Sequence, residues 1–157
     1  MSVSQIKAIA IEIATEILEA AKSGSLDSVV LKYDTQGKPI GDLSRVYSHS
    51  GIYVFTIEKE GALAASYVGK CENDGRLRQH ITGKNLNGTP LKPSVGRKYD
   101  EILETLGRGF TVRVNLYSNE EFDKSSLSCI EIKALEIAKQ EFKNIFPREK
   151  HWIQRIG

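Results

Sequence analysis

Two apolar segments joined by a short polar turn constrain the fold of this chain more than any other feature. Residues 51–57 are rich in β-branched and aromatic side chains, which predicts a buried strand. Residues 58–61 (Glu-Lys-Glu-Gly) are a turn sequence. Ala64 to Val68 is predicted to be a second strand, which returns beside the first and is closed by Gly69. We therefore expect the chain to be organised around a β-hairpin.

The segments on either side predict helices and further strands. Apolar residues at three- and four-residue spacing predict helices over 3–22, 95–106 and 125–144, and alternation predicts strands over 28–33 and 110–117. A short helix is also expected from about Asp74 to Ile81. The fold class is α/β (α+β), with a three-stranded antiparallel or mixed central sheet flanked by helices and an extra N-terminal helix and strand.

The length of 157 residues and an apolar content of 40% suit one soluble globular domain. We divide it into an N-terminal extension (1–50), a core (51–147) and a C-terminal tail (148–157) that is expected to pack back on the domain. The N-terminal helix has a capping box at Ser2 and Gln5. Its stripe of Ile6, Ile9, Ile13 and Ile17 is either a core face or a dimer interface. In 110–117 the even-numbered residues are expected to face inward, and Thr111, Arg113 and Asn115 outward.

Several polar side chains follow the hairpin closely enough to meet in space. Tyr53 and Tyr67 lie on the two neighbouring strands, and Lys70 comes soon after them. Arg76 and His80 are four positions apart, so on a helix they share one face. Two phenols, an ammonium, a guanidinium and an imidazole without a carboxylate indicate an anionic partner, most simply a phosphodiester.

At these residues the chain resembles the GIY-YIG nucleases. The resemblance rests on Gly51-Ile52-Tyr53, on Tyr67-Val68-Gly69, and on Arg76 and His80, and it covers about 95 of the 157 residues when the glutamate and asparagine named below are included. The segment between the two tripeptides is slightly longer than is usual in the family. Arg76 also lies one position closer to Gly69 than usual, so Arg78 is a rival for the arginine role.

The resemblance implies a metal-binding glutamate on the helix after the third strand. Glu131 fits the family pattern best, because Ala134 and Leu135 supply the apolar residues three and four positions on and Asn144 follows 13 positions later. Glu136 is the alternative. The implied cofactor is one Mg²⁺ or Mn²⁺ per site, and Mg²⁺ typically binds one or two carboxylates together with substrate oxygens.

The predicted function is therefore metal-dependent hydrolysis of phosphodiester bonds in DNA, of a restriction-like or repair-like kind. The expected catalytic residues are Tyr53, Tyr67, Arg76, His80 and Glu131. In this scheme one tyrosine positions and deprotonates the attacking water, Arg76 holds the scissile phosphate, and Glu131 holds the metal ion. Two rivals stay open: a non-catalytic nucleic-acid-binding module that keeps the nuclease fold, and an unrelated α/β domain that binds a small anion.

The distribution of charge is more informative than the net charge of +2. Residues 68–98 carry seven Lys or Arg against two acids, which predicts a phosphate-facing patch or else a solvated basic surface. The residues expected to bind DNA are Lys70, Arg78, Lys84, Asn85 and Asn144. Lys84 and Asn85 lie in the polar loop 82–90. This loop suits contacts with phosphate, and an ordinary surface loop is an equally good interpretation.

The expected location is the cytoplasm. The N-terminus lacks the pattern of a secretory leader, no apolar run is long enough to span a membrane, and the two cysteines, Cys71 and Cys129, lie far apart. Double-strand cutting with one site per chain would favour a homodimer or sequential nicking. His49, just before the first hairpin strand, is expected to be structural or exposed rather than catalytic.

Overall fold

The computed structural model describes residues 2–72, 75–85, 87–90, 97–118 and 124–141. In this part of the chain the elements follow one another in the order α1 (Val3–Ser23), β1 (Asp27–Val30), α2 (Ser44–Tyr47), β2 (Ser50–Lys59), β3 (Ala62–Glu72), α3 (Arg76–Thr82), α4 (Arg97–Gly107), β4 (Thr111–Tyr117) and α5 (Lys124–Glu141). The fold is α+β, as predicted. The predicted C-terminal tail and Asn144 lie outside the described residues.

The four strands form one sheet in the order β1-β4-β2-β3, and every neighbouring pair is antiparallel. The predicted three-stranded core corresponds to β3, β2 and β4. The sheet is wider than that core because the N-terminal strand β1 pairs with the free edge of β4. The sequence left an antiparallel or a mixed sheet open, and the structure selects the antiparallel one.

The β2–β3 hairpin is longer than predicted. Its strands pair from Ser50 opposite Glu72 to Lys59 opposite Ala62, and Glu60 and Gly61 adopt φ of 54° and 78° in the turn. Two residues with positive φ match the twist of antiparallel strands, which explains the tight connection. The prediction that Gly69 closes the second strand is wrong, because glycine there still pairs with β2 and the strand continues to Glu72.

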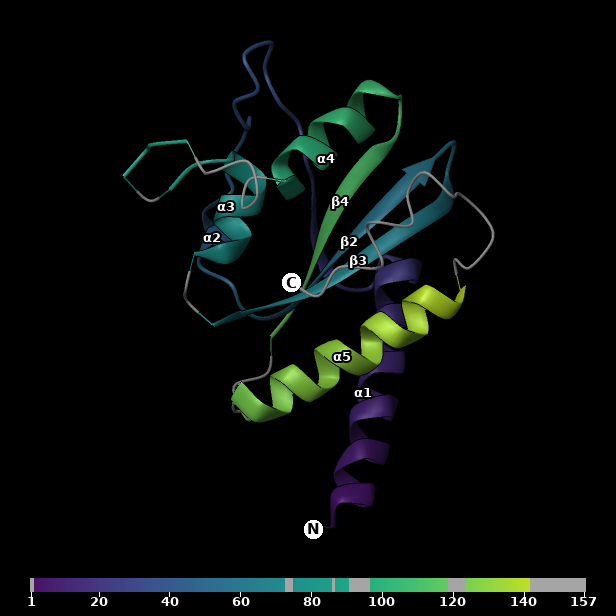
Figure 1. The fold of residues 1–157 in the computed structure, drawn as a ribbon. Helices are drawn as coiled ribbons and strands as arrows, with labels where there is room; N and C mark the ends of the chain where they lie inside the picture. Colours follow the sequence, from purple (N-terminus) through teal and green to yellow (C-terminus); the bar gives the residue numbers. More distant parts are fainter. Residues whose placement is uncertain (1, 73–74, 86, 91–96, 119–123, 142–157) are drawn as a thin grey trace.

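Helices cover both faces of the sheet (Figure 1). On one face, α2, α3 and α4 cover a core that includes Tyr53, Phe55 and Tyr67. On the other face, α1 and α5 pack over a second core that includes Ile52 and Val54. Since residues of β2 alternate between the two cores, this central strand is buried on both sides.

Because α1 and α5 cover the second face of the sheet, the prediction that one residue of β4 faces solvent is wrong. Val112 and Val114 face the first core as expected, but Asn115, which was expected to face solvent, is fully buried. Its side-chain amide donates to the Val54 carbonyl oxygen at 2.9 Å and to Thr56 Oγ1 at 3.1 Å. A polar side chain is tolerated at this position because its amide hydrogens find acceptors on β2.

Helix α1 begins with the predicted capping box at Ser2 and ends at Gly24, which has a left-handed conformation. Its predicted isoleucine stripe is only partly buried: Ile17 is in the core, while Ile6 and Ile9 are 45% and 41% exposed. The buried face is instead built around small residues that let α1 approach α5 closely; they include Ala10, Ala14 and Ala21.

Candidate active site

The pairing of β2 with β3 brings together the last residues of the two tripeptides of the sequence motif. Tyr53 pairs with Gly69, and the Tyr53 ring lies across the glycine. A Cβ atom at position 69 would overlap Cζ and the hydroxyl oxygen of Tyr53 and would lie 2.6 Å from its Cε2. The second glycine of the motif is therefore explained by the tyrosine of the first tripeptide.

Gly51 has a different structural reason. Its φ of 140° is rare for residues with a side chain, and an added Cβ would overlap the carbonyl oxygen of Tyr117 and lie 3.3 Å from the Cα of Ser118. The close approach of β4 to the start of β2 therefore requires glycine at this position.

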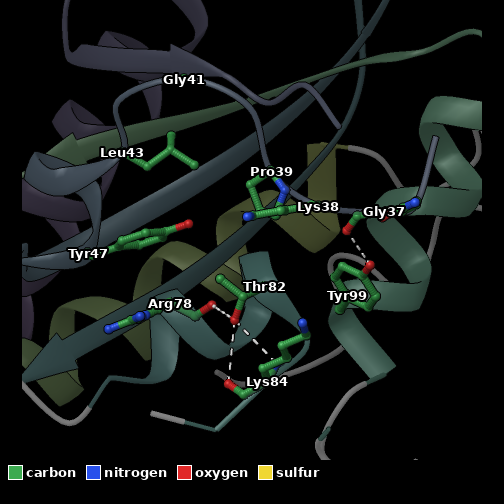
Figure 2. A pocket seen from close by; sticks show the side chains of 11 residues that line it. Gly37, Lys38, Pro39, Gly41, Leu43, Tyr47, Arg78, Thr82, Lys84 and Tyr99 are labelled. Atoms are coloured by element: carbon green, nitrogen blue, oxygen red, sulfur yellow. Dashed lines mark hydrogen bonds between the residues drawn. The ribbon is translucent and has the colours of Figure 1, made fainter. Parts of the chain in front are cut away.

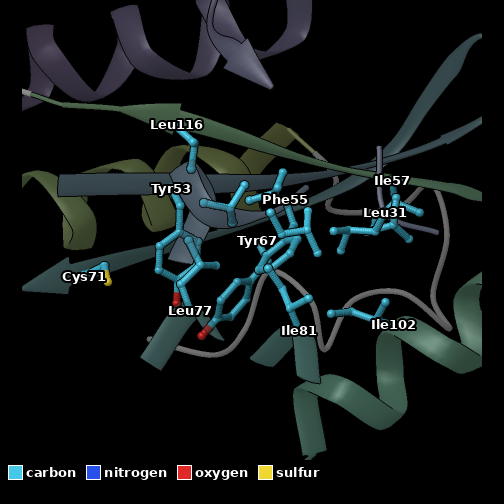
Figure 3. Packing of buried hydrophobic residues seen from close by; sticks show 14 of the residues in the cluster. Leu31, Tyr53, Phe55, Ile57, Tyr67, Cys71, Leu77, Ile81, Ile102 and Leu116 are labelled. Carbon is cyan, nitrogen blue, oxygen red and sulfur yellow. The ribbon is translucent and has the colours of Figure 1, made fainter. Parts of the chain in front are cut away.

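The two tyrosines and His80 form one aromatic cluster, as the sequence predicts. The ring centroids of Tyr53 and Tyr67 are 6.5 Å apart, and His80 lies edge-on to both at 6.2 and 6.3 Å. Figure 3 shows both phenol hydroxyls on the same side of the core, close to Leu77 of α3. Edge-to-face packing of this kind fixes the ring positions.

Arg76 and Glu131 both act electrostatically on Tyr53. Burial raises the pKa of Tyr53 well above its usual value, the neighbouring Tyr67 and Glu131 raise it further, and Arg76 lowers it. The side chain is 0% exposed, and its hydroxyl has no hydrogen-bond partner among the described residues. Tyr53 is therefore a neutral phenol at physiological pH.

The two candidate metal ligands differ sharply in burial. Glu131 on α5 is 3% exposed, and its neighbours on the helix, Ile130 and Ala134, pack into the second core. Glu136 is exposed and pairs with Lys133 at 3.3 Å. A buried carboxylate that acts on Tyr53 is better placed for the site than a carboxylate on the surface. The side chain of Leu135 lies outside the described residues.

Arg76 and Arg78, the two candidates for the arginine of the site, also differ in their surroundings. Arg78 is exposed, and its guanidinium lies 5.3 Å from the ring centroid of Tyr47 on α2. Arg76, in contrast, acts on Tyr53. The structure therefore associates Arg76, rather than Arg78, with the tyrosine cluster.

The other predicted DNA-binding residues lie at or near the surface. Lys70 is half-buried on β3, and Lys84 and Asn85 are exposed in the loop after α3. The Asn85 side-chain amide donates to Thr89 Oγ1 at 3.0 Å within that loop. Lys84 lies in the same pocket wall as Arg78, apart from the tyrosines.

A buried ion pair beside the tyrosines was not predicted. Lys98 and Glu101 on α4 are 3% and 7% exposed, and their Nζ and Oε2 atoms are 2.5 Å apart. The Lys98 ammonium lies 3.9 Å from the ring centroid of Tyr67. In the sequence Lys98 belongs to the basic stretch 68–98, and the only local signal of the ion pair is an acid three positions on.

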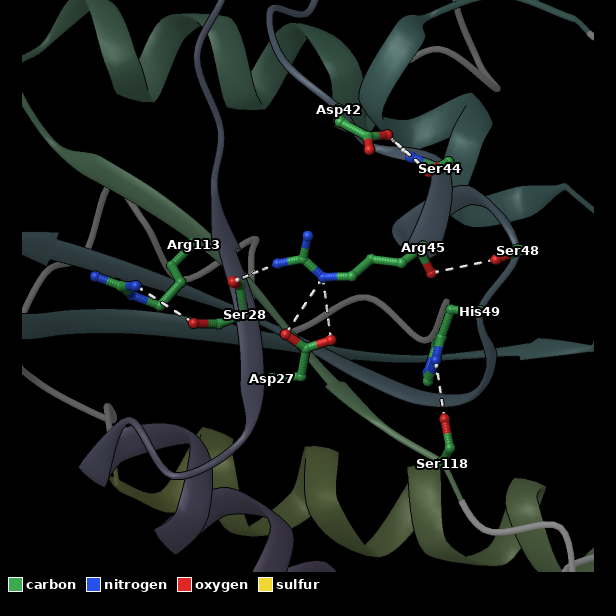
Figure 4. A network of polar contacts seen from close by, with 9 residues as sticks. All are labelled: Asp27, Ser28, Asp42, Ser44, Arg45, Ser48, His49, Arg113 and Ser118. Atoms are coloured by element: carbon green, nitrogen blue, oxygen red, sulfur yellow. Dashed lines mark hydrogen bonds and ion pairs between the residues drawn. The ribbon is translucent and has the colours of Figure 1, made fainter.

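His49 is structural, in line with its interpretation from the sequence. It is buried, its Nε2 lies 2.9 Å from the Ile52 carbonyl oxygen, and Nδ1 lies 3.3 Å from Ser118 Oγ (Figure 4). Nearby, Arg45 of α2 pairs with Asp27 of β1 at 3.1 Å. These contacts tie the start of β2 to the neighbouring elements.

The residues present fit a single divalent cation. Mg²⁺ needs only one or two protein carboxylates when substrate phosphates and water complete its shell, and Glu131 can supply one. The described residues contain no group of three or more His, Cys, Asp or Glu that could form a cage around a metal ion. The donor set therefore suits a site that is completed by the substrate.

None of the helices in the described part of the chain combines the length and the apolar character that a membrane crossing requires. Comparison with models of known families, with curated proteins and with solved structures finds no match to this chain. The resemblance to the GIY-YIG nucleases therefore rests on the sequence motifs named above.

Proposed function

We propose that this protein is a metal-dependent endonuclease of the GIY-YIG type that hydrolyses phosphodiester bonds in DNA. The observation that carries the proposal is the convergence of four distant segments: Tyr53, Tyr67 and His80 form one cluster, and the charges of Arg76 and Glu131 act on it. A phenol, an imidazole, a guanidinium and a buried carboxylate together suit the attack of water on a phosphate.

The residues would divide the chemistry as follows. The neutral hydroxyl of Tyr53 orients the attacking water, and His80 accepts the proton of that water, since imidazole is the side-chain base best suited to neutral pH. As the new P–O bond forms, the bond to the leaving sugar oxygen breaks, and that oxygen takes a proton from solvent. Arg76 binds the non-bridging oxygens and stabilises the charge that develops on them. Glu131 would hold Mg²⁺, which supplies Lewis-acid stabilisation of the phosphate when it is bound.

The second candidate is a non-catalytic nucleic-acid-binding module that keeps the nuclease fold. The burial of both tyrosines, each at most 1% exposed, favours it, because the described residues cover the phenols. The two candidates share the basic surface and differ in whether bound DNA is cut.

Cleavage of supercoiled plasmid tests the proposal. The protein should nick or linearise the plasmid with Mg²⁺ and not with EDTA. Glu131→Gln should lower the rate by about 10²–10³-fold, the usual cost of losing an electrostatic stabiliser. The matched control is Glu136→Gln on the same helix, which should cut at the unaltered rate because Glu136 is exposed.

Binding of the same plasmid separates the two candidates. If Glu131→Gln binds DNA as well as the unaltered protein and neither protein cuts, the chain is a binding module. If Glu136→Gln, and not Glu131→Gln, abolishes cutting, the assignment of the metal ligand is wrong.

The cellular setting follows from the same proposal. We expect the protein to act on DNA in the cytoplasm, where the free thiols of Cys71 and Cys129 would stay reduced. Since each chain carries one proposed site, double-strand cutting would need a homodimer or two sequential nicks. The ratio of nicked to linear plasmid at early times distinguishes these two routes.

A further inference from the structure

A pocket of about 350 Å³ is lined in part by Arg78 and Thr82 of α3 (Figure 2). Its walls come from the loop before α2, from α2, from α3 and the loop after it, and from α4. The lining residues used below are Lys38, Tyr47, Arg78, Thr82, Lys84 and Tyr99. The proposed nuclease function leaves this pocket without a role.

Helix α3 forms a wall shared by the pocket and the candidate active site. Arg76 and His80 are four positions apart and belong to the tyrosine side, whereas Arg78 and Thr82, also four apart, line the pocket. Residues four apart share a helical face, and a shift of two positions turns to the opposite one. A ligand in the pocket would therefore lie close to a substrate held by Arg76.

The pocket is positively charged. Lys38, Arg78 and Lys84 line it, and none of the described lining residues carries a carboxylate. The acids around the cavity lie outside its lining. Asp34 accepts the backbone N–H groups of residues 36 and 38, and Asp42 accepts the backbone N–H and the hydroxyl of Ser44. Asp34 and Asp100 act electrostatically on Tyr99 and so offset part of the positive charge. The charge of the cavity therefore favours an anion.

The pocket is preformed by packing around Tyr99. The Tyr99 hydroxyl donates to the Gly37 carbonyl oxygen at 2.5 Å, and Figure 2 shows this bond at one end of the cavity. Gly83 has a φ of 70°, and a Cβ there would lie 2.5 Å from Cδ2 of Tyr99. Tyr33 packs edge-on to Tyr99 and donates to the Ile81 carbonyl oxygen at 2.7 Å. Ligand sites are typically preformed in this way.

An aromatic ring and a guanidinium lie together in the same cavity. The Arg78 guanidinium lies 5.3 Å from the Tyr47 ring centroid, and the Tyr47 ring lines the pocket beside the side chain of Lys38. Nucleobases stack on tyrosine rings and on guanidinium planes, and their phosphates pair with lysine. A volume near 350 Å³ lies at the lower end of the range for small-ligand sites, so one nucleotide fits better than a larger group.

We propose that this pocket binds one unpaired nucleotide of a nucleic-acid strand, with its phosphate on Lys38 and Lys84 and its base against Tyr47 and Arg78. This inference rests on the proposed function, since it names the class of DNA that the nuclease would select. A base inside a duplex is stacked and cannot enter a pocket unless it is extruded. The preferred substrate is therefore DNA with a single-stranded or extruded nucleotide beside the scissile bond.

Fluorescence anisotropy in EDTA tests the inference without any dependence on cutting. The probes are a short labelled thymidylate oligonucleotide, the same strand with abasic sugars, and a blunt duplex of equal length. The unaltered protein should bind the thymidylate strand at least tenfold more tightly than the abasic strand, as stacking predicts. It should also bind the thymidylate strand more tightly than the duplex.

Variants at the exposed Lys38 and Lys84 and at the partly buried Tyr47 then locate the binding. Lys38→Gln/Lys84→Gln should weaken strand binding at least tenfold and reduce the salt slope by about 0.7, the value for one lost phosphate contact on a single strand. Tyr47→Leu should remove the preference for thymidylate over abasic strand. The control is Lys7→Gln, which replaces an exposed lysine on α1, on the other face of the sheet. It should change neither the affinity for the strand nor the salt slope.

Competition by free ligands distinguishes the sources of the anion. Thymidine monophosphate should displace the strand, and inorganic phosphate should not do so at the same concentration. The inference would be overturned if phosphate displaced the strand as well as thymidine monophosphate does, or if the abasic strand bound as tightly as the thymidylate strand. It would also be overturned if Lys7→Gln weakened strand binding as much as the double lysine variant. Strand binding that meets these expectations in a protein that never cuts plasmid would support the pocket and refute the nuclease proposal.

Discussion

Replacing Gly69 with alanine would test the contact on which the candidate active site is built. The added methyl group has no free space, because the ring of Tyr53 occupies the position of the new Cβ. Tyr53 is 0% exposed and packs against Phe55 and Tyr67, so the ring can move only by displacing other core residues. Overpacking of this kind costs about 1–3 kcal/mol. A cost of about 2 kcal/mol would lower Tm by about 4–8 °C in a domain of this size.

The measurement is thermal or urea unfolding followed by circular dichroism, with Gly107→Ala as the control. Gly107 ends α4, and a Cβ there would meet nothing within 4 Å. Alanine at an unhindered helical position is expected to stabilise a protein by about 0.4–1 kcal/mol. Both substitutions replace glycine with alanine, but Gly69→Ala is expected to lower the free energy of unfolding and Gly107→Ala to raise it.

A double-mutant cycle identifies Tyr53 as the cause. Leucine at position 53 lacks the ring atoms Cε2 and Cζ and the hydroxyl, so in a Tyr53→Leu background Gly69→Ala should cost less than about 0.5 kcal/mol. The coupling energy between the two sites should then exceed about 1 kcal/mol, as expected for residues in contact. An equal cost in both backgrounds would refute the packing of Tyr53 on Gly69.

Three further predictions concern buried polar groups. Glu101→Ala should destabilise the fold by about 3–5 kcal/mol in urea unfolding, because it removes the carboxylate that pairs with the buried Lys98 ammonium. The exposed Glu104 on the same helix can be replaced at a cost below about 0.5 kcal/mol. Burial lowers the pKa of His49, so the unfolded chain takes up its proton at a higher pH than the folded chain. The free energy of unfolding should therefore fall as the pH drops below about 6.5, and a His49→Gln variant should show a smaller fall. Asn115→Leu should cost about 1–3 kcal/mol despite its greater apolarity, because two acceptors on β2 lose their donor.

The elements that the sequence predicts well are those whose pattern is local. The hairpin follows from two apolar runs and one turn, but its exact register does not. The pairing shifts by one residue between Ile57 and Glu58, and this irregularity sets Tyr53 opposite Gly69. The helical spacing of Arg76 and His80 likewise places both on one face of α3. These local rules explain why Tyr53, Tyr67 and His80 could be grouped before the structure was known.

The features that the sequence does not reveal depend on packing between distant elements. Asn115 alternates with apolar residues on β4 and so reads as exposed, and only the helices α1 and α5 over that face make it buried. The spacing of the isoleucines of α1 predicts that they face the core, but the face of α1 that packs on α5 is made largely of alanines. Binary patterns indicate that a face is apolar, and they do not indicate how much of it a neighbour covers.

The difference between what residue types suggest and what packing imposes also affects the assignment of catalytic roles. Residue types alone suggest that a tyrosine serves as the base, because a nearby guanidinium would lower its pKa. In the structure Arg76 does lower the pKa of Tyr53, but burial and the neighbouring Tyr67 outweigh it, so the net shift is upward. A proton acceptor of another kind is then needed, and His80 lies in edge contact with both phenols. If that assignment holds, Tyr53→Phe should lower the cutting rate without moving its pH profile, whereas His80→Gln should abolish the acidic limb of the profile. An acidic limb that persists in His80→Gln would return the role of base to a tyrosine.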